Sequence, residues 1–375
     1  MSRGQGRGAT GLFISQSNFL KSGGGGVQIC TREFIDVIEA ADVDLTILPF
    51  EPDRRLSTSL LRLVDSSPFV RPFAPDLLPK IEAAARQTPF DFVFLNQEVL
   101  AALGPFLRST LGGRCKIVVL SHGLEHTDLL HMIRLRGRLP ISGRTRPTAS
   151  VLLGRIFLAE QHFRQFIDGV CAISSFDADV EHWLGSRHVV WLPRVVTSRP
   201  LAWQPTPGRL GFVGTLDHAP NLEGLVAILE VMARQQTQGM TVRVVGSMDI
   251  AEWLRSRFAH VEVLGALDDA ALAVEAATWT AFLHPIFCLP RGASTKLALG
   301  LSWEIPVVTT PPGRRGYVWG EGGPLEVDTP EAFVAACQFD PAAAQHSRHE
   351  VQRAVATSPT VESVAAQMRS FLAGL

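Results

Sequence analysis

The chain has 375 residues, of which 46% are apolar and 19% are charged. Its length exceeds that of one ordinary α/β core, and its apolar content excludes a largely disordered protein, so we expect two domains. The formal net charge of -1 creates no overall field that would attract nucleic acid. We therefore expect no nucleic-acid partner.

The cysteines and the apolar runs bear on cellular location. The five cysteines are scattered without a CxxC pair, which is typical of buried, reduced thiols: Cys30, Cys115, Cys171, Cys288 and Cys337. The sequence shows no signal peptide and no run of about 20 apolar residues. We expect a cytoplasmic protein, either free or peripheral to the inner face of the membrane.

The first half of the chain alternates short apolar runs with longer amphipathic stretches, such as residues 31–41 and 155–168. This alternation is typical of a doubly wound parallel sheet. The predicted strands begin at Gly11, Asp44, Phe90, Lys116, Gly169 and Val189.

The segment from Ser198 to Gly208 carries three prolines and predicts a linker. A second series of strands follows it, beginning at Arg209, Thr241, His260, Thr280, Ile305 and Pro324. We therefore predict an α/β protein with Rossmann-like domains at 1–200 and 208–350.

The residues 351–375 predict a C-terminal helix, with Ser358 as its cap and Pro359 in its first turn. Apolar side chains recur there at helical spacing and need a surface to cover. Two positions remain open for this helix: it packs on its own domain, or it crosses back to the first.

A glycine turn follows the first strand of the second series, in the string GFVGTLDHAPNLEGLVAILE. Gly214 and Thr215 form the turn, and Asn221 is placed to cap the next helix. The N–H groups at that helix start can receive a diphosphate. Asp217 makes the string more specific than a common strand–glycine–helix unit.

A cationic loop lies within HPIFCLPRGASTKLALGLSWEIPVVTT, residues 284–310. Its backbone, hydroxyl and charged groups suit a nucleotide diphosphate leaving group held without a metal. The predicted donor-binding residues of this loop are Arg291, Gly292, Ser294, Thr295 and Lys296. The alternative is that Arg291 and Lys296 are exposed charges that only keep the loop in solvent.

The first half carries two further candidate segments. Consecutive glycines follow the first strand, and Gly25 and Gly26 would let the backbone approach the donor, unless they are a plain flexible loop. The string LSHGLEHTDLL follows the fourth strand, where α/β sheets bind ligands. We predict that His122 contacts the transferred sugar and that Glu125 or Asp128 orients the acceptor. The string also admits a metal site, but no second ligand cluster is evident, so we expect no metal or cofactor.

Arginines recur with few acidic residues between Arg134 and Arg155. Such a loop either holds an anionic acceptor, or lies against acidic lipid headgroups, or is simply solvated. These interpretations remain open, and the second would make the protein a peripheral membrane protein.

These strings resemble, in patches from Gly23 to Gly316, the family 4 (group 1) glycosyltransferases. In that family the glycine turn has the sequence FVGSMDxxPNxxA. The cationic loop is approximately APLRxxxGxxxKxLEAMAxGxPVVAT, and Lys296 aligns with its lysine. Its GGVE loop and its HNxE turn resemble the two segments of the first half. The resemblance implies a GT-B fold, a nucleotide-sugar donor, and transfer that is metal-independent and retains anomeric configuration.

The chain departs from the family at two positions. Leu299 stands where the family has a glutamate that usually binds the ribose hydroxyls, and Glu304 stands where it has a glycine. The resemblance therefore leaves ribose to a backbone group or a neighbouring side chain, unless the site has lost its activity. We do not expect Glu304 to replace the missing carboxylate.

The sequence as a whole predicts a glycosyltransferase of polysaccharide biosynthesis or related metabolism. Its donor would be a nucleotide sugar, and its acceptor a glycan, a lipid-linked saccharide or a small molecule. A nucleotide-sugar epimerase or phosphorylase on the same fold is an alternative, but its acid/base groups are not evident. A catalytically inactive GT-B binding module is another; Leu299 favours it, whereas Arg291 and Lys296 together argue against it.

Overall fold

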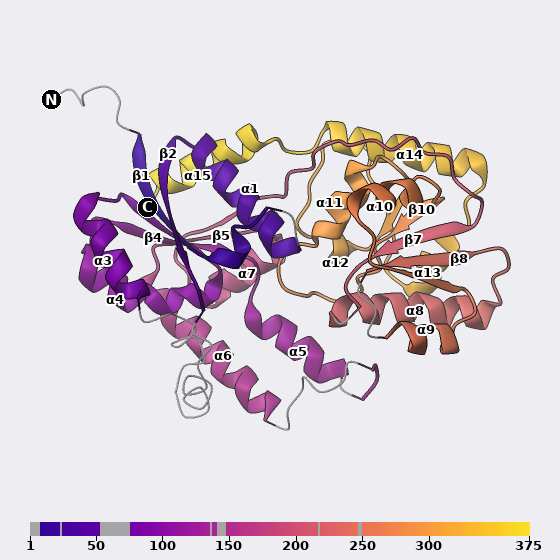
Figure 1. The fold of residues 1–375 in the computed structure, drawn as a ribbon, viewed down its shortest axis with the longest axis horizontal. Coiled ribbons are helices and arrows are strands. Elements are labelled where there is room, and N and C mark those ends of the chain that lie inside the picture. The colour runs from indigo at the N-terminus through magenta and orange to yellow at the C-terminus, as the bar shows by residue number, and fades with distance from the viewer. Residues whose placement is uncertain are drawn as a thin grey trace. The chain divides into compact units, whose positions relative to one another are not determined.

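The structure is a computed structural model that describes residues 8–22, 25–52, 76–135, 137–140, 148–216, 218–246 and 250–375. Two compact units divide the chain. The first comprises Met1–His126, Pro147–Pro193 and Thr360–Leu375, and the second comprises Thr127–Arg146 and Arg194–Pro359. Each contains a six-stranded parallel sheet with helices on both faces (Figure 1), as the alternating pattern predicts.

The sheet of the first unit has the order β2-β1-β3-β4-β5-β6. Its strands are β1 (Ala9–Gln16), β2 (Val43–Phe50), β3 (Phe92–Asn96), β4 (Lys116–Ser121), β5 (Gly169–Ala172) and β6 (Val189–Trp191). Leu12, Phe13 and Ile14 of β1 are all 0% exposed. Because successive side chains point to opposite faces, both faces of this sheet must be covered.

Helices and 3-10 turns supply that cover. They are η1 (Ser17–Phe19), α1 (Gly26–Ala40), α3 (Leu77–Gln87), η2 (Glu98–Leu103), α4 (Gly104–Leu111), α6 (Ala149–Phe163), η3 (Arg164–Phe166) and α7 (Ser175–Trp183), with α5 (Glu125–Leu135) following β4. Side chains of α3, α4 and α6 join the core on one face of the sheet.

The sheet of the second unit has the order β12-β11-β10-β7-β8-β9. Its strands are β7 (Arg209–Val213), β8 (Thr241–Val245), β9 (Val261–Gly265), β10 (Ala281–Leu283), β11 (Val307–Thr309) and β12 (Leu325–Glu326). The chain adds strands outward from β7 in one direction and then returns to β10 and continues in the other. The order therefore reverses between β7 and β10.

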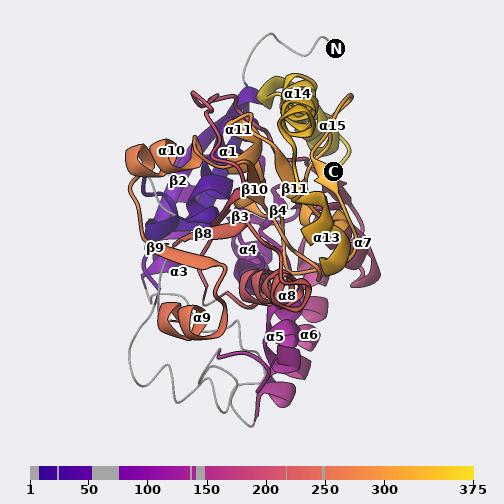
Figure 2. The same cartoon turned by 90° about the vertical axis from the view of Figure 1, so that its right-hand side faces the viewer.

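Helices cover both faces of this second sheet (Figures 1 and 2). They are α8 (Ala219–Gln235), α9 (Ala251–Arg257), α10 (Asp269–Ala276), α11 (Thr295–Ser302), α12 (Pro311–Arg314), α13 (Pro330–Ala336) and α14 (Pro341–Ala356). One core gathers side chains of α8, α9 and α13, and another gathers those of α10, α11 and α14. Trp279 is completely buried in the second of these cores.

The C-terminal segment differs from its prediction in two ways. Residues 351–356 end α14, and the last helix is α15 (Val361–Ala373), which begins after Thr360 and not after Ser358. Thr360 and Ser363 form a reciprocal capping box, whereas the Ser358 hydroxyl donates back to the Ala354 carbonyl at 2.8 Å. The local cap motif prevails because it satisfies two backbone groups at once.

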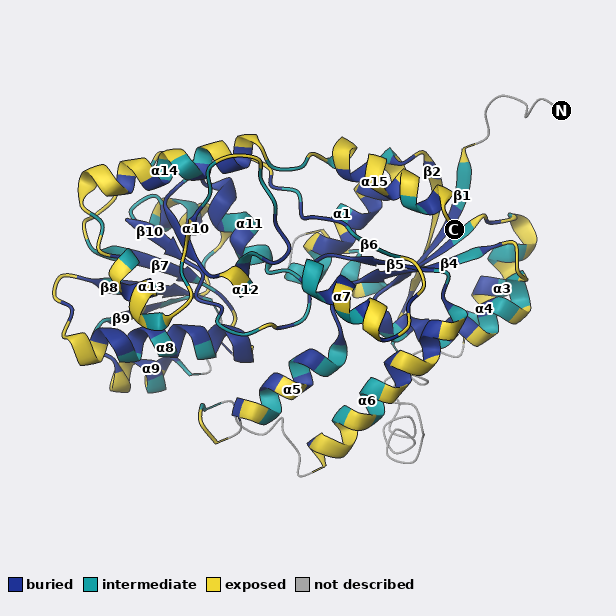
Figure 3. Ribbon diagram, turned by 180° about the vertical axis from the view of Figure 1, so that it is seen from behind, coloured by how far each residue is buried: buried dark blue, intermediate teal, exposed yellow. Residues whose placement is uncertain are grey.

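Helix α15 belongs to the first unit, which decides between the two positions left open by the sequence. It packs against α1, and the thiol of Cys171 in β5 lies 3.8 Å from the sulfur of Met368. A Cβ on Gly169 would lie 2.6 Å from the ring of Phe371. Val364, Ala365, Met368 and Leu372 are the buried residues of this helix, which Figure 3 colours by burial. The C-terminal helix thus crosses back, as the GT-B resemblance implies.

Among the residues that the structure describes, no helix has the length and apolar character needed to cross a bilayer.

Candidate functional site

The carboxyl ends of β7 and β10 form the topological switch point of the second sheet. At such a point the loops diverge, and open α/β sheets bind ligands there. Gly214 follows β7 and leads to α8, while His284 follows β10 and leads to α11. The site thus lies where two helices begin.

Lys296 lies directly over the glycine turn. It occupies the first turn of α11, and a Cβ on Gly214 would come within 3.0 Å of its Cε. Its Nζ donates to Asn221 Oδ1 at 3.2 Å, and Asn221 Nδ2 donates to the Thr215 carbonyl at 2.9 Å. Lys296, Gly214 and Thr215, three of the predicted donor-binding residues, are therefore brought together.

Asn221 does not cap α8 as the sequence predicts. His218 occupies the N-cap position, and Asn221 is a buried residue inside the first turn. Pro220 suits the start of a helix, so the helix begins before Asn221. The amide is thereby freed to connect Lys296 with the turn.

The ammonium group of Lys296 has lost much of its hydration. Burial lowers the pKa of Lys296 to about 8. The N-termini of α8 and α11 add N–H groups with partial positive charge. A desolvated cation beside two helix starts is suited to a diphosphate.

His284 supports the start of α11 from beneath, a role that sequence reasoning missed. Its Nδ1 lies 2.9 Å from Thr309 Oγ1 and its Nε2 lies 2.8 Å from Ser294 Oγ. Burial, with the charges of Lys296 and Arg315, lowers the pKa of His284 to about 3. The ring is therefore neutral, and it fixes Ser294, the N-cap of α11. Its position at the carboxyl end of a predicted strand was the available signal.

The loop before α11 has a constrained backbone. Gly292 is buried and has φ +63°, a conformation that favours glycine, and Thr295 is the first residue of the helix. Tyr317 donates its hydroxyl to the Ser294 carbonyl at 2.6 Å. Arg315 donates to the Arg291 carbonyl at 3.1 Å. These contacts hold the predicted donor loop in one shape.

Asp128 lies in the same unit as the donor loop and pairs with it. Its Oδ2 is 3.0 Å from Arg291 Nε and 3.7 Å from His218 Nε2, and the Arg291 backbone N–H donates to its Oδ1 at 3.4 Å. Burial raises the pKa of Asp128, but the contact with His218 and the charge of Arg291 outweigh this effect and leave the pKa lowered. Asp128 is thus a carboxylate that orients Arg291.

His122 is a buried residue of the first unit, just after β4. Its Nε2 lies 2.7 Å from Asn96 Oδ1, and its ring packs edge-on against Phe34 with centroids 5.5 Å apart. The Asn96 amide in turn donates to Ser15 Oγ at 2.8 Å and to Thr31 Oγ1 at 2.9 Å. A hydrogen-bonded network therefore sets the orientation of the His122 ring.

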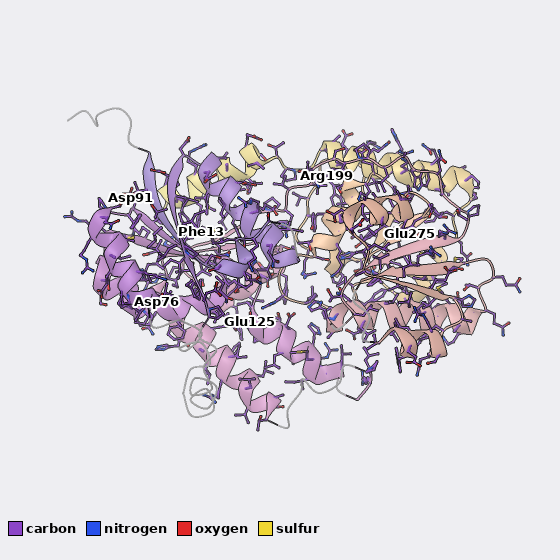
Figure 4. All side chains as sticks on the ribbon, viewed as in Figure 1. Phe13, Asp76, Asp91, Glu125, Arg199 and Glu275 are labelled. Atoms are coloured by element: carbon purple, nitrogen blue, oxygen red, sulfur yellow. The ribbon has the colours of Figure 1, made fainter. Side chains whose placement is uncertain are left out.

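Glu125, labelled in Figure 4, is the first residue of α5. Its backbone N–H donates to Glu160 Oε1 at 2.9 Å, and the other Glu160 oxygen lies 2.5 Å from His126 Nδ1. The buried Glu160 thus anchors the start of α5, and this pairing was not evident from the sequence. Of the predicted glycine loop, Gly25 is the N-cap of α1 and Gly26 its first residue.

Two predicted features fall partly outside the described residues. Asp217 lies outside them, as do Arg136, Arg144 and Arg146. The segment predicted as one basic loop is also helical at its ends, because Arg134 lies in α5 and Arg155 in α6.

The two departures from the family pattern have structural explanations. Leu299 is partly buried and packs against the core around Trp279. Glu304 has φ +54°, the left-handed conformation for which glycine is suited. Its carboxylate contacts Ser198 Oγ at 2.5 Å and Gln352 Nε2 at 3.3 Å. The Glu304 carboxylate is therefore already occupied by Ser198 and Gln352.

The two parallel sheets, the switch-point site and the returning C-terminal helix define a GT-B fold. The sequence matches no family model and no curated protein, but solved structures match over nearly the whole chain. A sucrose-phosphate synthase from Thermosynechococcus elongatus is 17% identical with a TM-score of 0.62, covering 98% of this chain and 100% of that one.

Two other solved structures match over the same shares, 98% of this chain and 100% of each of theirs. The lipopolysaccharide outer core galactosyltransferase WaaB, in its apo form, is 14% identical with a TM-score of 0.62. Anabaena HepE, in complex with UDP-glucose, is 14% identical with a TM-score of 0.64. At these identities the likeness establishes the fold.

Proposed function

We propose that this protein is a glycosyltransferase that takes a sugar from a nucleotide-diphosphate donor. The observation that carries the proposal is the desolvated ammonium of Lys296, held over Gly214 between the starts of α8 and α11. The names of the similar structures support it, since they include a galactosyltransferase and a complex with UDP-glucose.

The proposed chemistry follows from where charge develops. As the bond between the sugar's anomeric carbon and the diphosphate breaks, negative charge builds on the leaving oxygen. Lys296, Arg291 and the N–H groups at the helix starts would stabilise that charge without a metal. The acceptor hydroxyl forms the new glycosidic bond, and its proton passes to the departing diphosphate. We propose that transfer retains configuration.

His122 and Glu125 are proposed as the residues that contact the sugar and orient the acceptor. Asp128 has the different role of orienting Arg291, because its carboxylate pairs with that side chain.

The acceptor is proposed to be a glycan, a lipid-linked saccharide or a small molecule. Val151 and Leu158 are exposed on α6 near Arg155, which favours a peripheral lipid contact.

A second candidate, an inactive nucleotide- or glycan-binding module, is favoured by one observation. Leu299 packs against the core where the family places a ribose-binding carboxylate. Nucleotide binding without donor turnover would identify this alternative.

The proposal is tested by calorimetric titration with UDP, GDP, TDP and CMP, followed by a donor hydrolysis assay with the sugar of the best binder. We expect one nucleoside diphosphate to bind and its sugar donor to be hydrolysed. Lys296→Ala should weaken that binding by about tenfold to a hundredfold, because a charge-assisted hydrogen bond contributes about 1.5–3 kcal/mol.

The matched control is Lys80→Ala, since Lys80 is an exposed lysine of α3 in the other unit. It should bind nucleotide as the wild type does. Absence of binding by all four nucleotides, or equal affinity of the Lys296→Ala protein, would refute the proposed site.

A further inference from the structure

Three side chains that ligate metals lie together in the second unit. His131 of α5, Glu223 of α8 and Cys288 of the loop after β10 place their ligand atoms within 4.8 Å of one another. His131 is buried and the other two are half-buried. Because they come from three distant segments, only the tertiary fold groups them.

The three ligand atoms form a mixed set that suits Zn²⁺. Imidazole nitrogen, carboxylate oxygen and thiolate sulfur all bind this ion, at about 2.0–2.3 Å. Tetrahedral geometry at those bond lengths separates ligand atoms by roughly 3.3–3.8 Å. An inward movement of about 1 Å at most therefore closes the site, and the fourth position is left for water.

The hydrogen bond of His131 leaves one ring nitrogen able to bind a metal ion. Its Nε2 lies 3.0 Å from the Leu289 carbonyl oxygen, which can only accept a hydrogen bond. Nε2 therefore carries the proton, and the lone pair lies on Nδ1. Metal-binding histidines commonly donate their second N–H to a backbone carbonyl in this way.

The charges also balance. One thiolate and one carboxylate neutralise a divalent cation, so the loaded site buries no net charge. Binding forms the three ligand bonds and releases the Cys288 thiol proton to solvent.

We propose that His131, Glu223 and Cys288 form a binding site for a Zn²⁺-type divalent ion. The ion would tie α5 and the beginning of α8 to the loop that leads to Arg291. It takes no part in the transfer step, and the proposal stands independently of the proposed function.

The test is a Co²⁺ titration of the full chain after chelator treatment, without nucleotide. We expect a sulfur-to-cobalt charge-transfer absorption that saturates at about one ion per chain. Cys288→Ala should abolish this absorption, whereas Cys337→Ala, which removes a buried thiol of the same unit, should keep it. A wild-type protein without the absorption, or an absorption that survives in Cys288→Ala, overturns the proposal.

The isosteric variant Glu223→Gln provides a second test if Cys288→Ala fails to fold. Zn²⁺ should raise the melting temperature of the wild type, because it binds the folded state, and the increase should vanish in Glu223→Gln. An equal increase in both proteins counts against the site.

Discussion

Lys296 supplies the buried positive charge of the candidate site. Its ammonium is held by Asn221 over the glycine turn, and burial lowers its pKa to about 8. An ordinary lysine keeps its charge until about pH 10.4. The first consequence of this environment is therefore a pH dependence in a range where most lysines show none.

We expect the affinity for a nucleoside diphosphate to fall about tenfold between pH 7 and pH 9. The pKa of Lys296 is lowered in the free protein, so the ammonium is present at pH 7 and is largely lost by pH 9; a bound anion favours the charged form. Isothermal titration at several pH values measures this change. In Lys296→Ala the affinity should be flat over the same range, and a wild-type affinity that is equally flat would contradict the assignment.

At the scale of elements, the connection from α11 to β11 carries a backbone conformation that its residue does not favour. Glu304 has φ +54°, and its carboxylate contacts Ser198 and Gln352. The Arg348 side chain donates to the Glu304 carbonyl at 3.0 Å. Side-chain contacts therefore compensate for the cost of a non-glycine residue in the left-handed region.

We predict that Glu304→Gly is more stable than Glu304→Ala by about 1 kcal/mol. Both variants lose the carboxylate contacts, but only alanine keeps the unfavourable φ. Urea denaturation measures the difference in free energy of unfolding. The control position is Gln345, which is exposed within α14. There Gln345→Ala should be more stable than Gln345→Gly, because glycine is the poorer helix former. Equal stability of the two Glu304 variants would contradict an unfavourable backbone conformation at this position.

At the scale of the whole molecule, the last helix completes a unit that begins at the other end of the chain. The first unit includes Thr360–Leu375, and Met368 of α15 is completely buried beside Cys171. The first unit therefore depends on a helix that is far from its strands in the sequence.

Met368→Ala should destabilise the first unit by about 2–5 kcal/mol, because it leaves a cavity in that core. Hydrogen exchange measured by mass spectrometry should rise in α1 and β5 and stay unchanged in β7 and β8. The control is Arg369→Ala, which removes an exposed ion pair with Asp42 and should cost less than about 1 kcal/mol. Uniform faster exchange across both units would contradict this division.

The segment predicted as a linker, residues 198–208, lies inside the second unit, but the amino-acid sequence correctly predicted both series of parallel strands. It could do so because strands buried on both faces must be short apolar runs, as Leu12, Phe13 and Ile14 illustrate. It also pointed to Gly214 and Lys296, which lie in recognisable strings.

The pairing of side chains from distant segments could be read only from the folded chain. Asp128 pairs with Arg291, 163 positions away in the chain, and His131 lies beside Cys288. Helix α15 joins the first unit, although its own apolar stripe fits either position. A stripe or a charge specifies that a partner is needed, but only the packing of distant segments selects the partner.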